Sequence, residues 1–157
     1  MFKKFLLLAS AGLMAIGPAV AAEKVKIGFV TTITTPAGVI GKDMVDAVKL
    51  AMEDIDGKMA GLDVELIVED DGFKPAIGKQ KTDKLVKQDK VQFVTGFIWS
   101  HVLLASQKSA LGAGKFLISS NAGPSQMAGK LCHKNFFSTS WQNDQTPMAM
   151  GEVLNLN

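Results

Sequence analysis

Apolar and polar positions follow helix or strand periodicities along most of the chain. Residues 24–31 alternate, with Val25, Ile27 and Phe29 on one face, as a half-buried strand does. Between residues 40 and 55 the apolar positions recur every three or four residues, which predicts an amphipathic helix. Similar patterns predict strands at 62–68, 91–95, 116–119 and 135–139, helices at 74–87 and 100–111, and a last helix capped by Thr146 and opened by Pro147.

Strands and helices alternate with short connections, and the strands at 91–95 and 116–119 are short apolar runs. This order is typical of an α/β fold, a three-layer α/β/α arrangement with a parallel sheet between helices. In such sheets ligands bind beyond the carboxyl ends of the strands. Five segments follow the predicted strands and are rich in hydrogen-bonding and stacking residues rather than paired acids and bases: 32–38, 70–73, 96–101, 119–123 and 138–144.

The first 22 residues have the pattern of an export signal. Lys3 and Lys4 precede an apolar run over residues 5–16, Gly17-Pro18 break it, and residues 19–22 supply small side chains for cleavage. A membrane anchor would need about 20 apolar residues, and this run is shorter. No later stretch is long enough either, so we expect a mature chain in the periplasm that is not inserted in the membrane.

Charge composition narrows the possible partners. All 17 basic residues are lysines, and without residues 1–22 the chain has 15 lysines and 15 acidic residues. A neutral chain without a basic patch is a poor candidate for nucleic-acid binding. Since arginine is absent, no bidentate guanidinium clamp on a carboxylate is available, and backbone amides and hydroxyls would have to hold an anion.

Common catalytic motifs are missing from the sequence. No G-x-G-x-x-G follows the first strand, the residues around Gly114-Lys115 and Gly129-Lys130 fail the phosphate-loop pattern, and residues 123–127 lack the last glycine of a nucleophile elbow. The run Glu69-Asp70-Asp71 could bind a cation or accept a phosphoryl group, but a solvated turn that caps the next helix is the simpler interpretation. We therefore expect no enzyme activity and no cofactor.

Cys132, the single cysteine, has no partner in the chain. In an exported protein it is a free thiol, the remnant of a lost pair or half of an intermolecular bond, or it is a small half-buried residue. His101 and His133 have no metal-ligand spacing around them, and we expect no metal site.

Three strand-end residues and one strand-end segment have two interpretations each. The helix that begins near Ser100 presents unpaired N–H groups and a positive dipole end, which suit a carboxylate. Ser100 itself could cap the helix or bind a ligand, and Trp99 could be a stacking wall or an edge of the core. Residues 119–123 could bind a ligand or form a plain turn. Trp141 is either a pocket aromatic or a core plug.

Several of these segments resemble one family in their order along the chain. They are residues 25–30, Pro36-Ala37-Gly38 with Gly41, residues 50–55, Glu69-Asp70-Asp71, Gly96, Ser119-Ser120-Asn121 and Asn135-Phe136-Phe137. They resemble the periplasmic substrate-binding proteins of branched-chain amino-acid ABC transporters, the leucine/isoleucine/valine-binding type, which have the type I periplasmic binding fold. Residues 141–145 are similar to the subgroup that takes aromatic acids or other non-amino-acid carboxylates.

This resemblance implies that residues 23–157 form the first of two lobes that close on a small carboxylate and deliver it to a membrane permease. It also implies ligand contacts by Trp99, Ser100, Ser120, Asn121, Ala122 and Trp141. Ser138 departs from the pattern, because many amino-acid binders carry an arginine there. The chain stops before a second lobe, so we expect a truncated product with weak affinity. A ligand-sensing receptor domain and a non-functional remnant are the alternatives.

Overall fold

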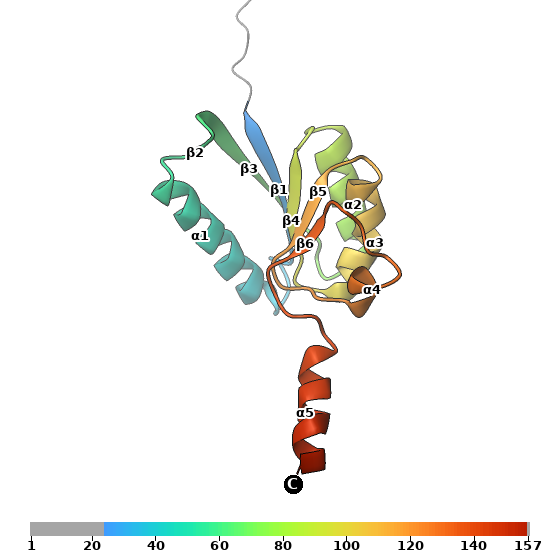
Figure 1. Ribbon diagram of the computed structural model, residues 1–157. Helices are drawn as coiled ribbons and strands as arrows, with labels where there is room; N and C mark the ends of the chain where they lie inside the picture. The colour runs from blue at the N-terminus through green and yellow to red at the C-terminus, as the bar shows by residue number, and fades with distance from the viewer. Residues whose placement is uncertain (1–23, 157) are drawn as a thin grey trace, which may run out of the picture.

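The computed structural model describes residues 24–156, and the predicted export signal at residues 1–22 lies outside them. Along this part of the chain the elements are β1 (Val25–Thr31), α1 (Gly38–Asp54), β2 (Lys58–Met59), β3 (Leu62–Asp70), α2 (Pro75–Lys87), β4 (Phe93–Gly96), α3 (Ser100–Leu111), β5 (Phe116–Ser119), α4 (Ser125–Ala128), β6 (Phe136–Ser138) and α5 (Gln145–Leu156) (Figure 1).

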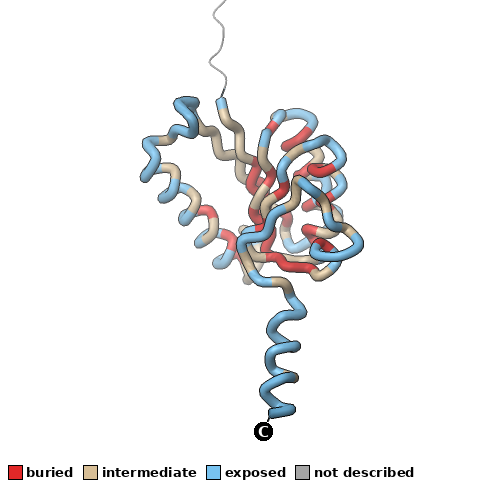
Figure 2. Tube along the Cα trace, in the orientation of Figure 1, coloured by how far each residue is buried: buried red, intermediate tan, exposed pale blue. Residues whose placement is uncertain are grey.

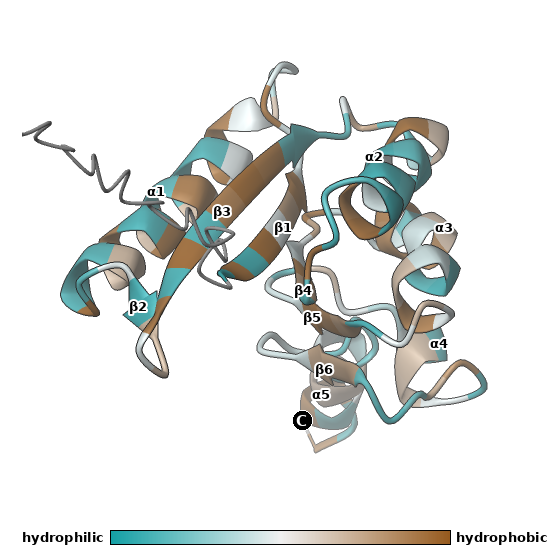
Figure 3. Ribbon diagram, turned by 90° about the horizontal axis from the view of Figure 1, so that it is seen from above, coloured by the Kyte–Doolittle hydropathy of each residue, from teal (hydrophilic) through white to brown (hydrophobic). Residues whose placement is uncertain are grey.

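The strands form one sheet in the order β2-β3-β1-β4-β5-β6. β3, β1, β4, β5 and β6 run parallel, and the short β2 pairs antiparallel with β3. Figure 3 shows α1 on one side of this sheet and α2 and α3 on the other. The predicted three-layer α/β/α architecture is confirmed, with β2 as an antiparallel addition at one edge.

The hydrophobic core lies between the sheet and the helices α2 and α3 (Figure 2). Leu85 of α2 and Leu103 of α3 are fully buried, and so are Val94 of β4 and Leu117 of β5. Complete burial of each such side chain stabilises the fold by about 1.5–3 kcal/mol. This half of the molecule therefore provides the rigid support for the loops at the ends of β4 and β5.

The opposite face of the sheet is less covered. Val94 and Leu117 point into the core, so their neighbours Phe93 and Phe116 point to the other side. There the rings of Phe93, Phe116 and Phe137 form a row across three strands, with centroid distances of 5.7 and 6.2 Å. Of the residues in α1, only Gly38, Gly41 and Val45 are buried. Apolar surface thus remains accessible on the α1 side of β4, β5 and β6.

The side on which the chain adds its next strand to the sheet changes between β1 and β4. The chain leaves β1 through α1 to reach β3 on one side, and it leaves β4 through α3 to reach β5 on the other. The two loops at the carboxyl ends of β1 and β4 consequently diverge to opposite faces of the sheet. In open parallel sheets this point is where ligands bind.

Besides shifts of a few residues at strand ends, two elements and one helix cap differ from the sequence-based expectation. The two-residue β2 and the one-turn α4 were not predicted, because neither is long enough to show a periodicity. The prediction that Thr146 caps the last helix is wrong, since α5 already begins at Gln145. This helix extends away from the sheet with no residue buried (Figures 1 and 2). Among residues 24–156, no helix is both long and apolar enough to span a bilayer.

Candidate functional site

The loops that follow β1, β3, β4, β5 and β6 meet at one end of the sheet, which we call the carboxyl edge (residues 32–37, 71–73, 97–101, 120–123 and 139–144). Backbone hydrogen bonds join the neighbouring loops. The Ser120 amide donates to the Gly96 carbonyl at 3.0 Å, and the Asn143 amide donates to the Gly123 carbonyl at 2.8 Å. All six predicted ligand contacts lie in these joined segments: Trp99, Ser100, Ser120, Asn121, Ala122 and Trp141.

Trp99 lies half-buried between the core and the carboxyl edge. Its ring packs against the core cluster, while its indole Nε1 donates a hydrogen bond to Thr32 Oγ1 at 2.9 Å. The ring also contacts Phe73, which follows β3, with centroids 4.8 Å apart and planes nearly perpendicular. Trp99 therefore lies at an edge of the core, its role as a stacking wall for a ligand stays a prediction, and Phe73 joins it as an aromatic residue that the sequence reasoning did not select.

Ser100 begins α3 but does not cap it. Trp99 occupies the N-cap position, and no side chain makes a capping hydrogen bond there. Ser100 Oγ instead accepts a hydrogen bond from Asn143 Nδ2 at 3.0 Å. Within residues 24–156 no acceptor takes the Ser100 hydroxyl hydrogen, so this hydroxyl can donate to a ligand. Asn143 was not among the predicted contacts, although its segment was identified as a strand-end loop.

The loop after β5 is held mainly by hydrogen bonds to β4 and to the loop after β4. Asn121 Nδ2 donates to the Ile98 carbonyl at 3.1 Å, which joins this loop to the one before α3. Ser120 is exposed, and its Oγ lies 3.2 Å from Thr95 Oγ1. Ala122 is buried, and its amide already donates to the Phe97 carbonyl at 2.9 Å. A ligand contact by Ala122 would have to come from its methyl group, and it stays a prediction.

Trp141 is 62% exposed, so its interpretation as a core plug is wrong. A Cβ atom on Gly123 would come within 2.0 Å of the Trp141 carbonyl oxygen, which shows how closely the two backbones pack. The indole ring is thus carried on a loop anchored to the carboxyl edge. Its contact with a ligand stays a prediction.

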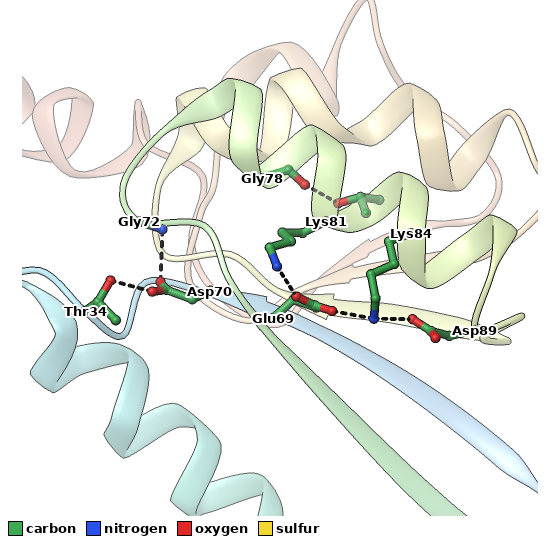
Figure 4. A network of polar contacts seen from close by, with 9 residues as sticks. Thr34, Glu69, Asp70, Gly72, Gly78, Lys81, Lys84 and Asp89 are labelled. Carbon is green, nitrogen blue, oxygen red and sulfur yellow. Dashed lines mark hydrogen bonds and ion pairs between the residues drawn. The ribbon is translucent and has the colours of Figure 1, made fainter.

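The acidic run Glu69-Asp70-Asp71 is less solvated than expected. Asp71 is fully buried, and Glu69 is nearly so. Glu69 forms ion pairs with Lys81 and Lys84 of α2, each at 2.7 Å (Figure 4). Burial alone would raise the pKa of Glu69, but the hydrogen bonds from these two lysines outweigh it and hold the pKa below its ordinary value.

Asp70 and Asp71 hold the turn before α2, but the prediction that they cap this helix is wrong, because Lys74 is the N-cap and no side chain makes a capping hydrogen bond there. Asp70 Oδ1 accepts a hydrogen bond from the Gly72 amide at 2.9 Å, and Asp71 Oδ1 accepts one from the Phe73 amide at 2.8 Å. Figure 4 shows Asp70 also joined to Thr34 in the loop after β1. Burial raises the pKa of Asp70, and the bonds from Thr34 and the amides of Ile33 and Gly72 more than offset this, so the net shift is downward. Among the described residues, no three His, Cys, Asp or Glu side chains are grouped to hold a metal ion.

Cys132 is exposed and forms no disulfide within residues 24–156, so its interpretation as a half-buried residue is wrong. It lines a cavity of about 200 Å³ between α4 and β6, together with His133 and Met127. His133 Nδ1 accepts a hydrogen bond from the Asn135 amide at 3.1 Å. The thiol is accessible, and the imidazole is partly engaged in the backbone turn.

A family model described as periplasmic binding protein matches residues 24–155. The chain belongs to the periplasmic binding protein family. No curated protein sequence matches it significantly.

Solved structures of such binding proteins are similar to the chain. An ABC transporter substrate-binding protein from Sphaerobacter thermophilus is 28% identical with a TM-score of 0.74, and the match covers 77% of this chain and 33% of that one. The branched-chain amino acid transporter substrate-binding protein LivJ from Streptococcus pneumoniae, in complex with isoleucine, is 26% identical with a TM-score of 0.70, covering 76% and 34%.

A third similar structure is the solute-binding protein of an ABC transporter from R. palustris in complex with benzoate. It is 26% identical with a TM-score of 0.75, covering 78% of this chain and 34% of that one. The predicted resemblance to substrate-binding proteins of branched-chain amino-acid-type ABC transporters is therefore confirmed. This periplasmic binding protein chain spans about a third of the length of these relatives.

Proposed function

We propose that the chain is the first lobe of the extracytoplasmic solute-binding component of an ABC uptake transporter, and that it delivers a small carboxylate to a membrane permease. In this proposal residues 1–22 are the export signal and residues 23–157 are the lobe. The observation that carries it is the convergence of Trp99, Ser100, Asn121 and Asn143 at the sheet's carboxyl edge, on loops joined by hydrogen bonds.

The charges at this edge favour a ligand with a carboxylate and no ammonium group. The Ser100 hydroxyl and the first amides of α3 are donors that an anion can accept. Each neighbouring carboxylate already accepts hydrogen bonds: Asp70 and Asp71 receive hydroxyl and amide donors, and Asp144 Oδ2 accepts from Gln142 Nε2 at 3.0 Å, while Asp71 Oδ2 is buried without a partner among the described residues. An ammonium group at this edge would have to compete with these donors for Asp70 and Asp144, and Asp71 is fully buried.

Aromatic side chains at the same edge favour a flat, ring-bearing acid over an aliphatic amino acid. Trp99 and Phe73 form a corner of two rings, and Trp141 exposes most of its indole. Ring–ring contacts contribute about 0.5–1.5 kcal/mol beyond the area they bury. The relatives in complex with benzoate and with isoleucine are equally identical to the chain, so these local features support the choice of an aromatic carboxylate.

Two-dimensional ¹H–¹⁵N NMR tests the proposal even for weak binding. Benzoate and isoleucine are titrated separately into the ¹⁵N-labelled chain, and the indole signals of Trp99 and Trp141 are followed with the amides of Ser100 and Asn121. We expect benzoate to shift these signals in a saturable manner and isoleucine to shift them less.

Ser100→Ala removes the hydroxyl donor and should weaken the benzoate response roughly tenfold, the loss of one hydrogen bond to a charged group. Ser125→Ala is the matched control, because Ser125 likewise begins a helix but in α4. If neither benzoate nor isoleucine shifts the NMR signals of the carboxyl-edge residues, the proposed function is wrong. A larger response to isoleucine would reject the aromatic class and keep the solute-binding role.

A further inference from the structure

A buried hydrogen-bond chain crosses three adjacent strand ends at the carboxyl edge. Asp71 follows β3, Thr32 follows β1 and Trp99 follows β4, and the sheet order places these strands side by side. Trp99 Nε1 donates to Thr32 Oγ1 at 2.9 Å, and Thr32 Oγ1 donates to Asp71 Oδ1 at 2.5 Å. Both Thr32 and Asp71 are fully buried.

Chemistry allows only one direction for this chain of bonds. An indole nitrogen can only donate, and an ionised carboxylate can only accept. The single hydroxyl hydrogen of Thr32 must therefore point to Asp71, which leaves a lone pair of the same oxygen facing Trp99. A hydrogen bond to an ionised acceptor is stronger than one between neutral groups, so the carboxylate holds the hydroxyl in the orientation that the indole needs.

The same carboxylate also places the second ring of the corner. Asp71 Oδ1 accepts the Phe73 amide at 2.8 Å, and Phe73 has a φ of 66°, a left-handed conformation that favours glycine. The Phe73 ring in this conformation packs nearly perpendicular to the rings of Trp99 and His101, with centroid distances of 4.8 and 5.1 Å. Asp71 is thus connected to one ring through a hydroxyl and to the other through a backbone amide.

We propose that Asp71 and Thr32 are positioning residues for ligand binding: they fix the plane of the Trp99 ring, and Asp71 fixes Phe73 against it, so that a ring-bearing ligand meets a preformed aromatic corner. This inference rests on the proposed function, because it assigns the Trp99 ring to the ligand. A side chain ordered before binding spares the complex the entropy of ordering it, which raises affinity.

Thr32→Val tests the inference, since it keeps the shape of the side chain and removes the hydroxyl. Thr31→Val is the matched control, because Thr31 is the preceding residue, is equally buried, and its hydroxyl has no hydrogen-bond partner among the described residues. The Trp99 indole N–H signal is identified by its retention in Trp141→Phe. Thr32→Ser restores the hydroxyl and serves as the rescue variant.

We expect Thr32→Val to move the Trp99 indole signal, speed its exchange with solvent, and weaken benzoate binding roughly threefold to tenfold. In Thr31→Val and Thr32→Ser the position of the Trp99 indole signal, its exchange rate and the benzoate affinity should stay close to those of the unaltered chain. An unchanged Trp99 signal in Thr32→Val overturns the hydrogen-bond chain, and a changed signal with unchanged affinity overturns the positioning role.

Equal effects of Thr31→Val and Thr32→Val would mean that changed packing, and not the loss of the hydrogen bond, causes them. This outcome would also overturn the inference. Failure of the proposed function is recognised separately, because in that case the unaltered chain itself does not respond to benzoate or isoleucine. The positioning role then falls with it, whereas the indole signal still reports whether the bond between Trp99 and Thr32 exists.

Discussion

Gly96 lies at the point where β4 ends and the loop to Trp99 begins, and its replacement by alanine tests the geometry of the carboxyl edge. Its φ is 102°, a conformation that L-residues rarely adopt. A Cβ atom there would lie 2.3 Å from the Val30 carbonyl oxygen of the neighbouring strand. That oxygen is fixed, because it accepts the Phe97 amide at 2.7 Å.

Two costs therefore add in Gly96→Ala. A positive φ on an L-residue costs about 1–2 kcal/mol, and overpacking against atoms that cannot move costs about 1–3 kcal/mol. We expect a loss of about 2–5 kcal/mol in the free energy of unfolding, measured by urea denaturation with circular dichroism.

Gly114→Ala separates these two costs. Gly114 has a φ of 72°, but nothing lies within 4 Å of the Cβ atom that would be added. This control should lose only the conformational part, about 1–2 kcal/mol. If the two variants lose the same stability, the close approach of β4 to β1 described above is wrong. The Trp99 indole signal should move in Gly96→Ala and stay in place in Gly114→Ala.

Two further predictions concern surface groups. Hydrogen bonds from Lys79 and Lys87 lower the pKa of Asp83 to about 2, so its contribution to stability should be complete above about pH 4 and be lost as the pH falls towards 2. Urea midpoints between pH 6 and pH 2 should show this fall, and Asp83→Asn should reduce it; an equal fall in the variant would contradict the assignment. Cys132 should react with Ellman's reagent in the native chain as fast as in urea, whereas strong protection would contradict its exposure.

Periodicity was sufficient to predict most of the fold. Residues 100–111 and 116–119 form a helix and a strand with the predicted bounds: the helix buries Val102, Leu103, Ala110 and Leu111, and the strand is a short apolar run that ends at the buried Ser119. The strand predicted at 62–68 extends two residues further, to Asp70. The charged residues Glu69 and Asp70 do not look like strand residues in the sequence. Glu69 is buried because it forms ion pairs with Lys81 and Lys84 of α2, and local periodicity cannot show these distant partners.

Local sequence predicted the site less well than the fold. The order of strands brings the loops together, so Trp99, Ser100 and Asn121 could be selected from their positions after predicted strands. The partners of these residues could not, because Thr32, Asp71 and Asn143 come from other loops, and their pairing depends on which strands are neighbours. From the sequence alone, a hydroxyl or carboxylate side chain has many possible hydrogen-bond partners, and the three-dimensional fold decides which of them lie close enough.

The row formed by Phe93, Phe116 and Phe137 affects how the chain behaves in solution. Three aromatic rings at fixed spacing on adjacent strands form a continuous apolar strip, and strips of this kind promote self-association as concentration rises. Self-association through this strip would make binding and unfolding midpoints of the chain depend on protein concentration. Light scattering recorded alongside each titration would separate the behaviour of the monomeric chain from that of its aggregates.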